Sequence, residues 1–331
     1  MTEKITLAHG AGGKISADLL HEVILPNFDN EILNELHDGA KIGKLAMTTD
    51  SYVVRPIFFR GGNIGKLSIC GTVNDLAVTG AVPKYISVGL ILEEGFAISD
   101  LQKILASMSE AAKESGVKIV TGDTKVVGKG QADGIFINTA GIGALIDGVD
   151  ISAKKICAGM QVIISGYVGD HATTILGERH GLELPPNIKS DCAPLNKLVC
   201  EILAAEPKIA MLRDVTRGGM AAVLNEIAAA SNYEIVIDES KIPVREEVRG
   251  VCEILGFDVL ELANEGKIIA IVPKNSAEKI LDVMRQNIYG KDAQIIGEVT
   301  ANRVGRVGLK TKIGSVRIVD TPIGNLVPRI C

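Results

Sequence analysis

The chain is 331 residues long, 47% of its residues are hydrophobic, and its formal net charge is −5. Its short apolar runs, interrupted by 36 glycines, exclude the stretch of about 20 apolar residues that a membrane span requires. The sequence has no basic run and only 3% aromatic residues, so we expect no nucleic-acid partner.

The N-terminal residues MTEKITLAHGAGGK lack the apolar core of a secretory signal, and the six cysteines form no metal-binding or redox motif. We therefore expect a cytoplasmic protein with reduced thiols. The same segment places Gly10, Gly12 and Gly13 before Lys14. Successive backbone N–H groups in such a turn can bind phosphate, and the lysine would add charge. A plain flexible terminus explains the spacing equally well.

Short β-like runs alternate with helical patterns along the rest of the chain. The runs 135–139 and 161–165 predict strands, and apolar residues at helical spacing predict one helix that ends at Gly116 and another after Asn275. Ser99 with Gln102, and Asn275 with Glu278, predict capping boxes at the starts of these helices. The expected fold class is α/β with mixed sheets.

The chain is longer than one average domain and has enough apolar residues for two cores. The polar stretch from Gly148 to Lys155 separates two predicted strands and is the expected boundary. We predict an N-terminal domain over residues 1–150 and a C-terminal α/β domain over residues 151–319. Residues 320–331 contain two prolines and a glycine, which predict a flexible, extended tail.

Four aspartates stand beside small or hydroxyl residues at the ends of predicted strands. Carboxylates from separate loops are the hard oxygen ligands that complete the coordination of Mg²⁺ together with ATP phosphates. Taken singly, each aspartate could equally cap a helix or a turn. The candidates for Mg²⁺ binding are Asp50, Asp75, Asp123 and Asp214. The first three, with Thr124, are also candidates for nucleotide binding.

A second glycine-rich loop, Thr216-Arg-Gly-Gly219, directly precedes an apolar helical pattern. Backbone N–H groups at a helix start, together with a nearby cation, favour an anion. We therefore predict that Arg217, Gly218 and Gly219 bind phosphate. An ordinary loop is the alternative interpretation.

Two residues are candidates for proton transfer. Lys125 follows Asp123 by two residues, so an extended Thr124 would bring both side chains to one face. Glu265 precedes a glycine and the apolar run 268–272, where burial would raise its pKa and suit a general base. A solvated lysine and a turn glutamate are the simpler interpretations.

The last residue is Cys331, which follows the segment Leu326-Val-Pro-Arg-Ile330. We expect an exposed, reactive thiol at the end of an arm that could span up to about 40 Å. Such an arm could carry a bound group between an internal pocket and another protein. The alternative is a final residue without a role.

Six motifs follow one another along the whole chain: Thr48-Thr-Asp-Ser-Tyr-Val-Val54, Cys70-Gly-Thr-Val-Asn-Asp-Leu-Ala77, Thr121-Gly-Asp-Thr-Lys-Val-Val127, Arg213-Asp-Val-Thr-Arg-Gly-Gly219, Ala263-Asn-Glu-Gly266 and Pro328-Arg-Ile-Cys331. Together they resemble the HypE family of hydrogenase maturation factors. The internal motifs also resemble the wider superfamily of aminoimidazole ribonucleotide synthetase, selenophosphate synthetase and thiamine-phosphate kinase. Arg60 departs from the family pattern, where proline is expected.

The resemblance implies a two-domain fold like that of aminoimidazole ribonucleotide synthetase, with ATP bound between the domains and a homodimer formed through the N-terminal sheet. Asp50, Asp75, Asp123 and Asp214 match metal and nucleotide positions of the family. The segment from Gly10 to Lys14 matches a mobile segment that covers phosphate. Lys125 and Glu265 match residues that handle a proton near the terminal cysteine.

The implied activity is the ATP- and Mg²⁺-dependent dehydration of S-carbamoyl Cys331 to a thiocyanate. The carbamoyltransferase HypF would load the cysteine, and the HypC-HypD complex would accept the cyanide for a nickel-iron centre. Two alternatives stay open. One is a superfamily amidine ligase or selenophosphate-type kinase that acts on a free small molecule, although the N-terminal segment lacks the cysteine expected for selenium chemistry. The other is a non-catalytic scaffold regulated by ATP.

Overall fold

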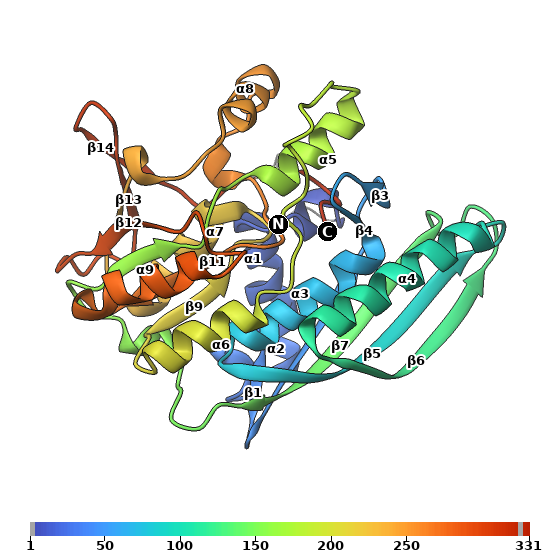
Figure 1. Ribbon diagram of the computed structural model, residues 1–331, viewed down its shortest axis with the longest axis horizontal. Coiled ribbons are helices and arrows are strands. Elements are labelled where there is room, and N and C mark those ends of the chain that lie inside the picture. Colours follow the sequence, from blue (N-terminus) through green and yellow to red (C-terminus); the bar gives the residue numbers. More distant parts are fainter. Residues whose placement is uncertain (1–3, 324–326) are drawn as a thin grey trace.

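A computed structural model describes residues 4–323 and 327–331 and contains two mixed sheets with flanking helices (Figure 1). Neighbouring strands of the first sheet are antiparallel except for the parallel pair β5 and β6. The predicted strand at 135–139 is the start of β7, which confirms it. In spatial order, this sheet consists of β1 (Ala40–Ile42), β2 (Leu45–Tyr52), β7 (Ile135–Leu145), β5 (Ala81–Glu93) and β6 (Lys118–Val127).

The second sheet lies toward the C-terminal end of the chain. Its strands are antiparallel apart from the parallel pair β10 and β13, so the prediction of mixed sheets is confirmed. The predicted strand at 161–165 is β8. In spatial order, the sheet consists of β14 (Val316–Val319), β13 (Val307–Lys310), β10 (Ile235–Asp238), β12 (Gln294–Val299), β8 (Gln161–Ile164), β11 (Ile268–Val272) and β9 (Met211–Asp214).

Helix α3 (Ile64–Val78) occupies the centre of the molecule. Its residues are buried on nearly all sides, as expected for a helix without a polar face. It contacts β2 and β7 on one side and α6 (Asn196–Ala205) and β9 on the other, so it joins the two sheets. Asn63 caps it by accepting hydrogen bonds from two backbone N–H groups of the first turn.

The remaining helices flank these layers. Helix α4 (Ile98–Ser115) packs on α3 so closely that a Cβ at Gly65 would lie 2.4 Å from the Ile104 carbonyl oxygen. None of the helices in the described part of the chain is long and apolar enough to cross a membrane. The other helices are α1 (Lys14–Leu19), α2 (Leu25–Phe28), α5 (Asp170–His180), α7 (Gly219–Ser231), α8 (Glu246–Leu255) and α9 (Ala277–Gln286).

Both predicted capping boxes are wrong, although both helices exist. Helix α4 begins at Ile98 with Ala97 in the extended cap position, so Ser99 already lies within the first turn. A short 3₁₀ turn, Lys274–Ser276, leads into α9, and Ser276 takes the cap position without a side-chain cap bond. The predicted end at Gly116 is confirmed, since this residue adopts the left-handed conformation of a helix C-cap.

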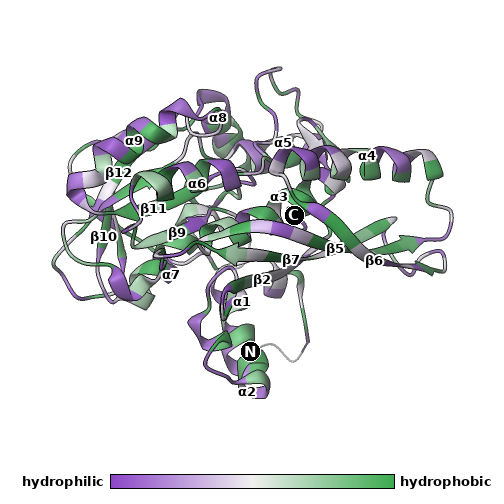
Figure 2. Ribbon diagram, turned by 60° about the horizontal axis from the view of Figure 1, so that its bottom comes forward, coloured by the Kyte–Doolittle hydropathy of each residue, from purple (hydrophilic) through white to green (hydrophobic). Residues whose placement is uncertain are grey.

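The two faces of the first sheet differ. Helices α3 and α4 cover one face, whereas Figure 2 shows no described helix along β5 and β6 on the other, which we name the open face. Large apolar side chains stay exposed on the open face. They share this face because residues two apart along a strand point the same way and paired residues lie in one row. They are Leu45, Met47, Tyr85, Ile91 and Ile142.

Hydrogen bonds and buried side chains fix the loop that contains Arg60 and the described end of the C-terminal tail. Arg60, which departs from the family pattern, donates from its backbone N–H to Glu178 at 2.8 Å and from its guanidinium to the Leu184 carbonyl at 2.7 Å. The predicted tail at 320–331 forms no helix in its described part, and residues 324–326 lie outside the described chain. Val327 and Ile330 are buried in a core shared with α3 and α5. The last five residues are therefore docked.

Candidate active site

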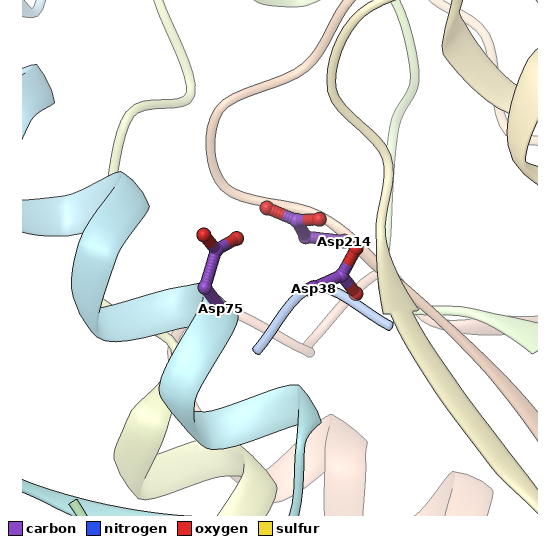
Figure 3. Close-up of side chains that lie close together, drawn as sticks. All are labelled: Asp38, Asp75 and Asp214. Atoms are coloured by element: carbon purple, nitrogen blue, oxygen red, sulfur yellow. The ribbon is translucent and has the colours of Figure 1, made fainter. Parts of the chain in front are cut away.

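Three carboxylates from distant parts of the chain face one another beside α3 (Figure 3). Asp75 stands on α3, Asp214 is the last residue of β9, and Asp38 lies in the loop before β1. One carboxylate oxygen from each residue lies within 4.8 Å of those of the other two. The fold thus brings together two of the four predicted aspartates and adds a third residue that the sequence analysis missed.

Burial and mutual repulsion disfavour negative charge in this cluster. Burial raises the pKa of Asp214 to about 8, and the Asp38 carboxylate adds to this effect. Burial also raises the pKa of Asp75 well above its ordinary range, with Asp214 as the next cause. Arg213 compensates in part, since its Nε lies 2.7 Å from Asp38 Oδ1. His37 adds no positive charge, because burial and Arg213 lower its pKa to about 3.

The donor set of the cluster fits a hard divalent cation. Asp38 Oδ2 is buried and has no hydrogen-bond partner among the described residues. Three carboxylates on separate elements can share one ion, and the ion would supply the positive charge that the cluster lacks. Mg²⁺, which prefers such oxygen ligands, therefore suits these residues.

Asp50 borders the cluster from β2. Burial raises its pKa, and the nearby Arg217 guanidinium opposes this shift. Two residues earlier, the Thr48 hydroxyl donates to Asp75 Oδ2 at 2.8 Å. Because strand residues two apart share a face, Asp50 also points to the covered side of the sheet. It is the third predicted aspartate that the fold places in this region.

The two predicted glycine loops pack against each other, although they are far apart in the chain. Gly12 has a φ of +80°, and a Cβ there would lie 2.9 Å from the Arg217 carbonyl carbon. The Arg217 guanidinium donates to the Gly10 carbonyl at 3.2 Å. Gly218, with a φ of +76°, precedes α7, which starts at Gly219. Only glycine combines this close approach with positive φ values, so both loops depend on the residues predicted for them.

The chain ends in the same region. The backbone N–H of Lys14, the first residue of α1, donates to the Pro322 carbonyl at 2.9 Å. Gly13 provides the turn into α1 with a φ of +84°. Val53 N–H donates to the Cys331 carbonyl oxygen at 2.9 Å. The first glycine loop, the strand that carries Asp50 and the C-terminus are therefore neighbours.

Cys331 lies partly buried, within electrostatic range of Glu265. The prediction of an exposed thiol is wrong in this conformation, because the buried neighbours Val327 and Ile330 anchor the tail. Burial raises the pKa of the Cys331 thiol, and the Glu265 carboxylate adds to the shift. The Arg217 guanidinium acts in the opposite direction. The thiol thus sits between an acidic and a basic side chain.

Glu265 has the properties expected of a buried proton carrier. It is 3% exposed, and its Oε1 has no hydrogen-bond partner within the described ranges. Burial raises its pKa well above the ordinary value, as the sequence analysis expected. A protonatable oxygen without a partner, next to a sulfur, can exchange a proton with a group carried on that sulfur.

The remaining predicted residues lie elsewhere. Asp123, Thr124 and Lys125 stand exposed on β6, the edge strand of the first sheet. Lys125 Nζ lies 2.7 Å from Asp123 Oδ1, so the two side chains share one face as expected. Hydrogen bonding to Lys125 lowers the pKa of Asp123, in contrast to the buried aspartates.

The strand register explains this separation. Asp50 pairs across the sheet, through Thr139 and Val88, with Gly122. Residues in one such row point to the same face, so the next residue, Asp123, points to the open face. The fold of a single chain therefore does not bring Asp123 and Lys125 to its own acidic cluster.

Three residues of the candidate site were missed by the sequence analysis. Asp38 stands before Gly39 at the start of a strand, which is the same local signal that marked the other aspartates. His171 and Arg179, both on α5, bind the C-terminal residues through backbone carbonyls. No motif marks these two residues, because their partners are more than one hundred residues away.

Comparisons with known proteins agree along the whole chain. The AIR synthase related protein N-terminal domain matches residues 30–145, and the corresponding C-terminal domain matches residues 158–310. The carbamoyl dehydratase HypE of Rhodobacter capsulatus is 46% identical, over 99% of this chain and 98% of that protein. A structure of the hydrogenase maturation protein HypE in complex with ATP is 46% identical, with a TM-score of 0.84 over 99% of this chain and 100% of that chain. A chain of a HypE-HypF complex is 50% identical, with a TM-score of 0.89 over 92% and 99%.

Proposed function

The chain belongs to the HypE family of carbamoyl dehydratases, and we therefore propose that it uses ATP to dehydrate a carbamoyl group on its own Cys331. It contains both AIR synthase related domains. One observation carries the proposal. The terminal thiol lies close enough to buried Glu265 and Arg217 for their charges to shift its pKa, in the same region as the acidic cluster and the glycine loops. The substrate sulfur and the groups that would act on it thus share one site.

ATP would bind where the two glycine loops meet. Backbone N–H groups of Gly10 and Gly13, with Lys14, can hold phosphate from one side, and the Gly12 N–H, which donates to Ser16 Oγ at 3.0 Å here, would have to be released to join them. Arg217, Gly218 and Gly219 offer a guanidinium and a helix N-terminus from the other. The structure of a HypE protein with ATP supports a nucleotide here.

Mg²⁺ would be held by carboxylates of the cluster. The residues are Asp38, Asp75 and Asp214, with Asp50 at the edge. When bound, the ion would neutralise phosphate charge during transfer. Among the chain's own residues, Arg213 already holds one oxygen of Asp38 and keeps that carboxylate in place.

The chemistry follows from the difficulty of removing an amide oxygen as hydroxide. The carbamoyl oxygen attacks the γ-phosphorus of ATP, and the bond to ADP breaks. The nitrogen then loses two protons while phosphate departs with the former carbamoyl oxygen, which leaves Cys331-S-C≡N. One of these protons ends on phosphate and the other is released. The products are the thiocyanate, ADP and phosphate.

Glu265 is the base in this scheme. Burial raises its pKa and so favours the protonated carboxyl, which must ionise before it accepts a proton from nitrogen. The positive charge of Arg217, which interacts with both Cys331 and Glu265, favours the ionised form. Burial of Glu265 limits the access of water to the base.

We further propose a homodimer formed through the open face. Five large apolar side chains are exposed there, and β6 is exposed along nearly its full length. Burial of such a patch favours association. Because Asp123 and Lys125 point away from their own acidic cluster, we assign them to the site of the partner subunit.

Partner proteins follow from the family. A complex of HypE with HypF is known, which supports HypF as the protein that carbamoylates Cys331 here. The HypC-HypD complex would take the cyanide for the nickel-iron centre. Both steps require that the tail leaves its docked position, because a half-buried thiol is not accessible to another protein.

Intact-mass analysis with mapping of the C-terminal peptide tests the proposed function. The chain is incubated with HypF, carbamoyl phosphate, ATP and Mg²⁺. We expect Cys331 to gain a carbamoyl group and then lose the mass of one water. Cys331→Ala should block both steps while Cys157→Ala, which removes an exposed thiol elsewhere, should block neither. A small-molecule enzyme would keep its activity in the Cys331→Ala chain, and a scaffold would consume no ATP, so either outcome would refute the proposal.

A further inference from the structure

The C-terminal residues pair with the segment after β2 like a short antiparallel strand. Val53 N–H donates to the Cys331 carbonyl at 2.9 Å, and Arg55 N–H donates to the Arg329 carbonyl at 3.2 Å. The two donors and the two acceptors are each two residues apart and run in opposite directions, as in an antiparallel ladder. The contact uses backbone atoms, so it fixes the position of the tail along the chain direction.

Arg179, in the last turn of α5, holds three carbonyl groups at once. Its Nη1 donates to Pro328 at 2.8 Å, and its Nη2 donates to Arg329 at 2.6 Å. Its Nε donates to the Arg55 carbonyl at 2.6 Å. The guanidinium therefore links the tail to the segment with which the tail pairs. A planar group with donors in a fixed fork is required for this geometry.

His171, in the first turn of α5, holds the next carbonyl. Its Nε2 lies 2.8 Å from the Ile330 carbonyl oxygen, which can only accept, so Nε2 carries the proton. Its Nδ1 then accepts from the Ser190 hydroxyl, 2.8 Å away. The ring is fully buried and stands edge-on to Phe59. His171 and Arg179 are eight positions apart, which places them near one face of the helix.

Two features oppose docking and make it reversible. Arg329 has a φ of +51°, a left-handed conformation that disfavours a residue with a side chain. Its guanidinium also lies near those of Arg55 and Arg179, and these positive charges repel one another. The Asp133 carboxylate offsets part of this repulsion, because it pairs with both Arg55 and Arg329. Docking is therefore a balance between carbonyl hydrogen bonds and these two costs.

We propose that α5 is the recognition element for the chain's own C-terminal peptide, with Arg179 and His171 as positioning residues that hold Cys331 beside Glu265. Every carbonyl from Pro328 to Cys331 accepts a hydrogen bond in the docked state, and two of the donors are side chains of this one helix. The ligand class is a peptide in a turned conformation with a terminal cysteine. The expected effect on the dehydration rate rests on the proposed function. The docking itself does not, because it is measured through the accessibility of the Cys331 thiol.

Cysteine alkylation of the full-length chain measures the docking. Peptide masses give the modification rate of Cys331 relative to that of exposed Cys157 in the same molecules. In Arg179→Met, which keeps the side-chain length but removes the donors, we expect this ratio to rise roughly tenfold or more, as for the loss of a charged hydrogen bond. Arg179→Lys retains the charge without the fork and should lie between the two.

Arg285→Met is the matched control, because Arg285 also donates to a backbone carbonyl, that of Ala293 at 3.1 Å, away from the tail. It should leave the ratio unchanged. An equal rise in this control, or no rise in Arg179→Met, would overturn the proposal. Where the wild-type chain does form the thiocyanate, a rise in Arg179→Met without any change in dehydration would refute the positioning role.

Single-turnover dehydration of the carbamoylated chain supplies the second readout. In Arg179→Met the rate should fall, because fewer chains are docked and the cysteine is held less firmly beside the site, while ATP affinity stays the same. If even the wild-type chain fails to form the thiocyanate but the ratio still rises in Arg179→Met, the proposed function fails and the recognition of the tail by α5 stands.

Discussion

The two faces of the first sheet use the same residue type in opposite ways. On the covered face, burial raises the pKa of Asp75, and neighbouring carboxylates add to the shift. On the open face, Asp123 is exposed and its hydrogen bonds to Lys125 lower its pKa. The comparison teaches that the surroundings, and not the residue type, decide whether an aspartate suits a cation or simply forms an ion pair.

The largest effect is expected beside the covered face, at Glu265. Glu265→Gln should slow dehydration by roughly 10²- to 10⁴-fold, because the base is lost. ATP binding and folding should change little, since glutamine resembles the protonated form that burial favours. Single-turnover mass spectrometry measures the rate. In the wild type the rate should rise with pH, because a raised pKa of the base moves its ionisation to higher pH, and this rise should vanish in the variant.

A mixture of two inactive variants tests whether the open face serves the partner. Glu265→Gln and Lys125→Ala are mixed after reversible dissociation. If Lys125 acts across the dimer, each mixed dimer keeps one intact site, and activity should recover to about a quarter of the wild-type value. If Lys125 acts within its own protomer, no site is intact and the mixture stays inactive, which would break the comparison.

The open face should also control association. Ile142→Glu places a charge in the centre of the apolar patch, between Met47 and Tyr85 in the strand register. We expect the dimer to weaken by roughly tenfold or more, because a charge in a buried interface must be desolvated. Sedimentation velocity over a concentration series measures this change. Ile254→Glu, at an exposed site on α8, is the control and should leave association unchanged.

The smallest expected effect is on the free energy of unfolding, and it distinguishes buried Asp75 from exposed Asp123. Asp75→Asn should raise the free energy of unfolding by on the order of 1 kcal/mol at pH 8 in Mg²⁺-free buffer, because it removes a buried charge that its neighbours repel. The folded-state pKa of Asp75 is raised, so its ionisation costs stability as pH increases, and the gain should shrink toward pH 4. Asp123→Asn should cause no measurable change, since solvent screens exposed ion pairs. Urea unfolding followed by circular dichroism gives both values, and equal shifts would contradict the comparison.

Several features depended only on local sequence. The strands at 135–139 and 161–165 and the helix end at Gly116 follow from spacing and from glycine's freedom. The shared face of Asp123 and Lys125 follows from the two-residue period of a strand. The raised pKa of Glu265 could also be expected, because the apolar run 268–272 signals a buried strand nearby.

Other features were decided only by the tertiary structure. The capping boxes failed because the start of a helix depends on backbone conformation, which residue types alone do not fix. Ala97 takes the cap position of α4, and Ser276 takes that of α9. Contacts between distant segments place Asp38 in the acidic cluster. Strand pairing turns Asp123 toward the open face and away from that cluster.

The local sequence marked most of the candidate residues, since hydroxyl, glycine and acidic neighbours are visible along the chain, but it did not mark His171 or Arg179. Only the tertiary structure decided which of them meet. The docking of Cys331 on α5 shows the physical reason, because its position comes from hydrogen bonds between the last residues and side chains more than one hundred positions away. A backbone carbonyl can accept such bonds whatever its side chain, so no pattern of residue types records them.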